Sequence, residues 1–229
     1  MYKALFFDLD DTLWDFSKNA EESFMEVYQK FSFGRYFMSF DHFYSLYEEK
    51  NKELWYAFGK GLIDRETLNT DRFRYPLERV GVFNNALAAD YATSFFDIIS
   101  SKTQLKLGAK EVLEVLYKRY PLYIISNGFK ELQYRKMESA QIHHYFKGII
   151  LSDHVGYNKP HPAIFKYALD LAQVRADEAV MVGDNWVADI CGAKEVGMDQ
   201  VFYSESCSEA NSFQSTYFIT DLRKLLEIL

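Results

Sequence analysis

The sequence predicts an α/β fold in which a parallel sheet forms the core and a helical unit follows the first strand. The short apolar run at residues 4–7 is typical of a strand that is buried on both faces. From residue 107 onward such runs alternate with helical patterns, which indicates parallel pairing through right-handed crossovers. Between residues 16 and 100 apolar residues recur only at helical spacing. We therefore expect a discontinuous core over residues 1–15 and 90–229, and a helical domain over residues 16–89.

The inserted segment is predicted to form four or five helices. Phe24, Val27 and Phe31 share one helical face, and Gly34, the residues 59–61 and Gly81 mark breaks between helices. We expect most of the many aromatic side chains here to form the core of this domain.

The later elements alternate between helix and strand. We expect helices at 109–119, 130–140, 164–172, 187–196 and 221–229, strands at 122–125, 148–151, 179–182 and 200–203, and an edge strand near Ile219. Cys191 should be a small buried residue of the helix at 187–196.

Composition and charge argue against several classes of protein. The 229 residues carry a net charge of −7, which argues against a nucleic-acid-binding surface. The two cysteines, Cys191 and Cys207, form no CxxC pair, and the first apolar run is too short for a signal peptide. No run approaches the roughly 18 apolar residues of a membrane span. We expect a cytoplasmic protein, a monomer or a homodimer, with no membrane and no nucleic-acid polymer as partner.

Polar residues follow four of the predicted strands. Because the carboxyl ends of parallel strands lie along one edge of a sheet, these residues should converge there. Three acids near one point suit a hard cation such as Mg²⁺, whereas a serine hydroxyl and a lysine suit phosphate oxygens. A glycine lets the backbone approach a ligand closely. Alone, the first cluster could equally be a turn after a strand, with Thr12 as a helix cap. The four clusters are Asp8, Asp10 and Thr12; Ser126, Asn127 and Gly128; Lys159; and Asp184 with Asp189.

The four clusters, in this order, resemble the motifs of the haloacid dehalogenase superfamily of phosphohydrolases. They read DLDDT at 8–12, SN at 126–127, KP at 159–160 and GDNWVAD at 183–189. The resemblance covers the whole chain and implies a Rossmann-like parallel-sheet core with an inserted α-helical cap. One position departs from the commonest pattern, because Asp11 stands where glycine is frequent.

The resemblance implies a role for each motif residue. Asp8 would attack phosphorus and become an aspartyl phosphate, and Asp10 would serve as general acid and then as general base. Lys159 would neutralise charge on Asp8 and on the phosphoryl group, and Asp189 would orient the metal shell or Lys159. Mg²⁺ would be held by the Asp8 side chain, the Asp10 backbone carbonyl and Asp184. Phosphate binding would fall to Leu9, Thr12, Ser126, Asn127 and Gly128.

The helical domain carries a further resemblance. Residues 51–63, NKELWYAFGKGLI, and the segment SNGF at 126–129 are similar to those of bacterial house-cleaning 5'-nucleotidases of this superfamily, which prefer pyrimidine nucleoside monophosphates. This implies that Trp55 or Phe58 stacks on a base and that Asn51 bonds the nucleoside. The alternative is that Trp55 belongs to the core of the cap.

The expected function is therefore a Mg²⁺-dependent phosphomonoester hydrolase with a small phosphorylated metabolite, first of all a nucleoside 5'-monophosphate, as substrate. A phosphatase of phosphoglycolate or a sugar phosphate, and a sugar-phosphate mutase, are alternatives within the fold. Asp10 and Asp184 speak against a 2-haloacid dehalogenase. A phosphoacceptor signalling module is the non-enzymatic alternative, but such modules are about half this length and carry their aspartate on a later strand.

Overall fold

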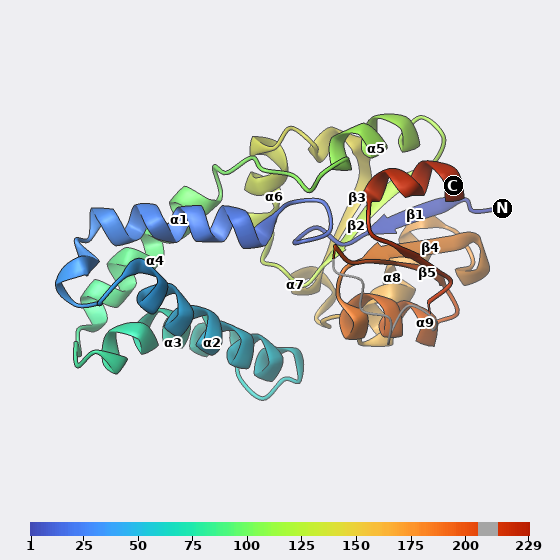
Figure 1. The fold of residues 1–229 in the computed structure, drawn as a ribbon. Coiled ribbons are helices and arrows are strands. Elements are labelled where there is room, and N and C mark those ends of the chain that lie inside the picture. The colour runs from blue at the N-terminus through green and yellow to red at the C-terminus, as the bar shows by residue number, and fades with distance from the viewer. Residues whose placement is uncertain (206–214) are drawn as a thin grey trace. The chain divides into compact units, whose positions relative to one another are not determined.

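The computed structural model describes residues 1–205 and 215–229, so Cys207 lies outside the described residues. The chain forms two compact units, one of residues 1–16 and 102–229 and one of residues 17–101 (Figure 1). The sequence placed the second boundary at residue 90, which falls inside the helix α4 (Asn85–Ile99). This helix belongs to the helical unit throughout its length, because its buried Tyr91 and Phe95 pack against Phe73 of that unit.

The first unit contains a sheet of six parallel strands in the order β3-β2-β1-β4-β5-β6 (Figure 1). The predicted α/β class and parallel pairing are confirmed, and the strand predictions were right to within two residues. Strand β1 lies between β2 and β4, so their carboxyl ends are neighbours. The strands are β1 (Ala4–Phe7), β2 (Leu122–Ser126), β3 (Phe146–Leu151), β4 (Ala179–Gly183), β5 (Asp199–Tyr203) and β6 (Tyr217–Ile219).

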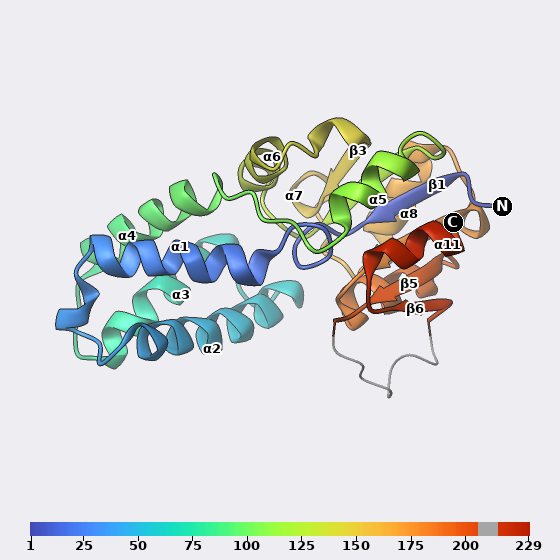
Figure 2. The same ribbon diagram turned by 45° about the horizontal axis from the view of Figure 1, so that its top comes forward.

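Helices cover both faces of the sheet, which explains why β1 is apolar at every position. Ala4 and Phe6 pack in one cluster with Ile164 and Phe165 of α8 (Pro162–Ala172). Side chains alternate along a strand, so the intervening β1 residues face the opposite side. There α5 (Ala109–Leu116) and α11 (Leu225–Ile228) lie side by side (Figure 2).

The remaining elements of this unit differ in detail from the predictions. The helix expected at 187–196 begins as a π-helical turn, η4 (Trp186–Cys191), and continues as α9 (Gly192–Glu195). The buried face of this segment is made by Ile190 and Ala193, so Cys191 is exposed and its predicted burial was wrong. The other elements are α6 (Lys130–Ser139), α7 (Ser152–Val155), and the 3₁₀ turns η2 (His143–Tyr145), η3 (Ala176–Glu178) and η5 (Leu222–Lys224).

The second unit is helical, as predicted. Ser39, Asp64 and Asn84 cap the starts of its last three helices by accepting backbone hydrogen bonds. Figure 2 shows these helices packed alongside one another. Its elements are α1 (Phe16–Lys30), the turn η1 (Phe33–Arg35), α2 (Phe40–Gly59), α3 (Arg65–Arg79) and α4.

Aromatic rings form the core of the helical unit. Phe24 is fully buried, and its ring stacks on Phe95 with centroids 4.0 Å apart. The Tyr47 ring lies 4.1 Å from the Phe24 centroid, and Phe43 packs at 5.8 Å. The prediction that the aromatics of this segment pack into their own core therefore holds for these rings.

Within the described ranges, each helix is too short or too polar to cross a membrane.

Replacing Phe24 by alanine should lower the free energy of unfolding by about 3–5 kcal/mol, because it leaves a cavity among packed rings. Phe83 is 81 % exposed, so Phe83→Ala is a matched control that should change stability by less than about 0.5 kcal/mol. Urea denaturation of both variants measures the difference. Similar stability in the two variants would contradict the assignment of Phe24 to the core.

Candidate functional site

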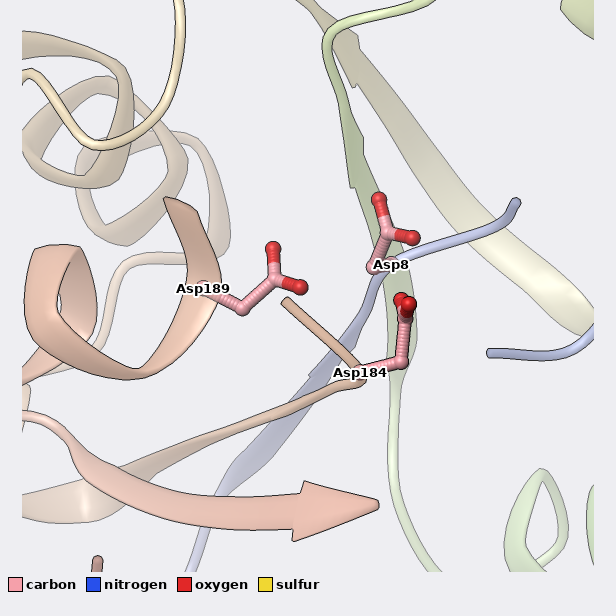
Figure 3. Close-up of side chains that lie close together, drawn as sticks. All are labelled: Asp8, Asp184 and Asp189. Carbon is pink, nitrogen blue, oxygen red and sulfur yellow. The ribbon is translucent and has the colours of Figure 1, made fainter. Parts of the chain in front are cut away.

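Three acidic side chains meet at the carboxyl edge of the sheet. Asp8 directly follows β1, Asp184 directly follows β4, and Asp189 comes from η4. One carboxylate oxygen of each lies within 4.8 Å of the others, and Figure 3 shows the three groups gathered around one point. The predicted convergence of residues far apart in the sequence thus occurs, because β1 and β4 are paired neighbours.

Lys159 connects these acids to the sheet. Its side chain is 3 % exposed, and its ammonium group donates to Asp8 Oδ1 at 2.5 Å, to Asp189 Oδ1 at 2.6 Å and to the Ile125 carbonyl at 2.7 Å. An ammonium group has three protons, so each one has a partner. The resemblance implied a place for Lys159 beside Asp8, with Asp189 as one of its possible partners, but the contact with the Ile125 carbonyl of β2 was not predicted.

Asn127 holds the backbone of Lys159 in place. Its side-chain Oδ1 accepts from the Lys159 N–H at 2.7 Å, and its Nδ2 donates to the Lys159 carbonyl at 3.0 Å. The sequence predicted phosphate binding by Asn127, whereas its bracing of the lysine loop was not predicted. An asparagine side chain has one acceptor and one donor group, and here both are used on the same residue.

Thr12 positions Asp184. Its buried hydroxyl donates to Asp184 Oδ1 at 2.9 Å and accepts from the Asp184 N–H at 3.0 Å, while Asp8 Oδ2 lies 3.5 Å away. Helix α1 begins four residues later, at Phe16, so Thr12 is not a helix cap. Leu9 is fully buried, so contact with a phosphate would have to come from its backbone.

Asp11 adopts φ = 60°, the left-handed region that favours glycine and that aspartate also tolerates. The frequent glycine at this position of the motif therefore has a conformational cause.

Asp189 is fully buried and uses both oxygens. Oδ1 bonds Lys159, and Oδ2 accepts from the Asn185 N–H at 3.0 Å. Gly183 makes room for it, because a Cβ at that position would lie 2.3 Å from Asp189 Oδ2. With its oxygens engaged, Asp189 suits the support of Lys159 better than direct metal binding.

The electrostatics of the cluster favour a cation. Burial raises the pKa of Asp184 to about 7, with Asp189 adding to the rise. Burial likewise raises the pKa of Asp8 well above its ordinary value, although Lys159 opposes this. Burial lowers the pKa of Lys159, but Asp189 and Asp8 outweigh that effect, so the lysine remains charged. Three acids share one lysine here. Asp8 and Asp184 could therefore ligate a divalent ion, which would supply the missing positive charge.

Asp10 is held apart from these acids by two residues that sequence reasoning missed. Its Oδ1 accepts from Lys136 Nζ at 2.8 Å, and its Oδ2 accepts from Gln133 Nε2 at 2.8 Å. Both partners lie on α6. The signal available in the sequence was a predicted polar helix immediately after the second motif.

Ser126 and Gly128 lie beside Gln133, one of the two partners of Asp10. Ser126 Oγ accepts from Gln133 Nε2 at 2.7 Å and from the Gly128 N–H at 3.1 Å. A Cβ on Gly128 would come within 2.3 Å of Gln133 Nε2. The glycine thus accommodates a side chain of this protein, a requirement that differs from the close ligand approach expected from the sequence.

Asn51, Trp55 and Phe58 lie on α2 of the helical unit. Their spacing of four and three residues places them on one helical face. The Trp55 and Phe58 rings meet edge to face, with centroids 5.7 Å apart, and Trp55 is partly buried. Asn51 Oδ1 accepts from the buried Arg72 at 3.2 Å and from the Tyr47 hydroxyl at 3.3 Å.

Residues 5–203 match the family model of haloacid dehalogenase-like hydrolases. The chain belongs to this family. It is 33% identical to a glyceraldehyde 3-phosphate phosphatase of Pyrococcus furiosus, covering 99% of this chain and 92% of that protein. It is 28% identical to the pyrimidine 5'-nucleotidase YjjG of Escherichia coli, covering 98% and 96% of the two chains. A crystal structure of the HAD-hydrolase YfnB from Bacillus subtilis, bound to magnesium, is 27% identical with a TM-score of 0.88, and covers 100% of this chain and 98% of that one.

The comparisons confirm the family and the Rossmann-like fold that the four motifs predicted. Pyrimidine 5'-nucleotidases are among the relatives, as the resemblance of the helical domain implied. Glyceraldehyde 3-phosphate phosphatases are similar to at least the same degree, so the likeness does not select one substrate.

Mg²⁺ should bind this hydrolase more tightly as the pH rises, because the metal requires the ionised form of Asp184, whose pKa is about 7. The raised pKa also means that the metal-free protein loses stability as the pH rises from 3.8 through about 7. Calorimetric titration should show an affinity about tenfold higher at about pH 8 than at about pH 6. The exposed Asp170 provides a control, since Asp170→Asn should keep this dependence. An affinity independent of pH would contradict the assignment.

Proposed function

We propose that this hydrolase removes phosphate from small phosphate monoesters in a Mg²⁺-dependent reaction that passes through an aspartyl phosphate on Asp8. The observation that carries the proposal is the pairing of Asp8 with Lys159 beside Asp184. It supports the proposal because the proposed nucleophile, a fixed positive charge and a proposed metal ligand lie close together. Phosphoryl transfer depends mainly on such positioning and charge stabilisation.

In the first step an oxygen of Asp8 attacks phosphorus while the bond from phosphorus to the ester oxygen breaks. The carboxyl of Asp10 gives its proton to the departing oxygen. Lys159 stabilises the negative charge that gathers on Asp8 and on the phosphoryl oxygens. A bound Mg²⁺, held by Asp8, Asp184 and the Asp10 carbonyl, would neutralise phosphoryl charge.

In the second step water attacks the phosphorus of the aspartyl phosphate. Asp10, now ionised, takes a proton from that water, and the bond between phosphorus and the Asp8 oxygen breaks. Inorganic phosphate leaves, and Asp8 and Asp10 return to their starting states. Ser126 and the backbone around Gly128 are proposed to hold phosphoryl oxygens, with Leu9 contributing through its backbone.

The substrate we favour is a nucleoside 5'-monophosphate, because the segment 51–63 carries polar and aromatic side chains suited to a base and the relatives include pyrimidine 5'-nucleotidases. Glyceraldehyde 3-phosphate or a related sugar phosphate is the second candidate, favoured by relatives named for that activity. Transfer to a second sugar hydroxyl in place of water would instead identify a mutase. A cytoplasmic location and a monomeric or homodimeric state complete the proposal.

Wild-type protein with Mg²⁺ should release phosphate from at least one member of a panel of nucleoside monophosphates, triose and hexose phosphates and phosphoglycolate. Asp8→Asn should reduce kcat by at least about 1000-fold with the fold intact, because it removes the nucleophile. Asp170→Asn makes the same chemical change at an exposed position and should keep full activity. Undiminished turnover by Asp8→Asn would refute the nucleophile, and an inactive wild type across the panel would refute the hydrolase.

Trp55→Ala should lower kcat/KM for a pyrimidine nucleoside monophosphate by about 10- to 100-fold, the range expected from loss of one base–aromatic stack. Hydrolysis of 4-nitrophenyl phosphate, which has no base, should change by less than about threefold. Tyr56 is 64 % exposed on the same helix, so Tyr56→Ala is the matched control. Equal losses on both substrates would place Trp55 in the core of the helical unit instead.

A further inference from the structure

Helix α6 carries two buried polar side chains on the face directed to the site. Gln133 is 0 % exposed and Lys136 is 1 % exposed, and they are three residues apart, so they share one helical face. Residues of these types are rarely buried without partners, since an unpaired polar or charged group is costly to remove from water. Both side chains donate to one shared partner, Asp10.

The two contacts bind opposite oxygens of the Asp10 carboxylate. Lys136 Nζ donates to Oδ1 and Gln133 Nε2 donates to Oδ2, each at 2.8 Å. Two donors on two oxygens prevent the carboxylate from rotating, which one contact would not do. The NH₂ group of the glutamine amide faces both Asp10 Oδ2 and Ser126 Oγ.

Lys136 is enclosed by aromatic rings as well as by Asp10. Its ammonium group lies 4.6 Å from the Trp14 ring centroid and 5.1 Å from that of Phe16. Ring faces attract cations at such distances. Trp14 and Phe16 follow the first motif closely in sequence, so the loop that carries Asp10 and the first residue of α1 supply the rings against which Lys136 packs.

Gln133 links Asp10 to the second motif. The second proton of its Nε2 group is donated to Ser126 Oγ at 2.7 Å. The site for Gln133 exists because residue 128 is glycine, as a Cβ there would overlap the amide. One side chain thus sets the spacing between the proposed proton donor and a proposed phosphate-binding hydroxyl.

We propose that Gln133 and Lys136 are positioning residues that hold Asp10 where it can protonate the leaving oxygen. This inference rests on the proposed phosphomonoester hydrolysis. When the ester bond breaks, the proton of Asp10 passes to the departing oxygen, and the Asp10 carboxylate that remains is paired with Lys136 and Gln133. The same two contacts keep that carboxylate in place to take a proton from water in the second step.

The dependence of the rate on the leaving group tests this role. An alkyl alcohol is a poor leaving group and needs the proton, whereas 4-nitrophenolate leaves without it. The measurement is kcat/KM with Mg²⁺ for an alkyl phosphate monoester and for 4-nitrophenyl phosphate. Since kcat/KM covers events up to the first irreversible step, it includes the protonation of the leaving oxygen, and the comparison of the two esters separates that protonation from effects common to both.

Lys136→Met removes the donor but leaves an unbranched chain against Trp14 and Phe16. It should lower kcat/KM for the alkyl ester by about 100-fold or more, and for the aryl ester by less than about tenfold. Gln133→Met should show the same bias, and it keeps the test available should the lysine variant fail to fold. Lys130→Met, on the exposed side of the same helix, should leave both values unchanged.

Equal losses on the two esters in soluble, folded variants would show a structural role only and overturn the inference. Variants that keep the wild-type kcat/KM for both esters would overturn the inference too. Failure of the proposed function would look different, because the wild-type protein itself would then hydrolyse neither ester.

Discussion

The site depends on the hydrogen bonds and ion pairs made by the buried ammonium group of Lys159. This group bonds Asp8, Asp189 and the Ile125 carbonyl, and so connects the ends of β1 and β2 with the π-helical turn after β4. Removing a charge from water is costly unless the charge is paired and hydrogen-bonded. Lysine and acids therefore require one another here: each would be an uncompensated buried charge without the others.

Neighbouring residues hold Lys159 and its acidic partners in position. Asn127 braces the Lys159 backbone from both sides, and Gly183 leaves the space that Asp189 occupies. Asp189 reaches Lys159 from a π-helical turn, an irregularity that is often found at functional sites. Thr12 couples the loop after β1 to Asp184. Residues of separate sequence motifs thus hold one another in place.

Two carboxylates that follow the first strand, those of Asp8 and Asp10, bind different partners. Asp8 belongs to the group around Lys159, which is dense in acids and suited to a metal. Asp10 points to α6, where Lys136 and Gln133 receive it. The division fits a reaction in which one carboxylate forms a bond to phosphorus and the other moves protons. Strand β1 ends at Phe7, so the course of the loop, and not the alternation along a strand, sends the two side chains to different partners.

The sequence by itself determined the fold class, the position of each core strand to within two residues, and the four motifs. These features depend on local patterns: continuous apolar runs at buried strands, and polar residues immediately after them. Only the tertiary structure decided which groups contact one another. The bracing of Lys159 by Asn127, the contact of Thr12 with Asp184 and the pairing of Asp10 with Lys136 all join residues distant in the chain. Such contacts depend on strand order and helix packing, and a single sequence carries no local pattern for them.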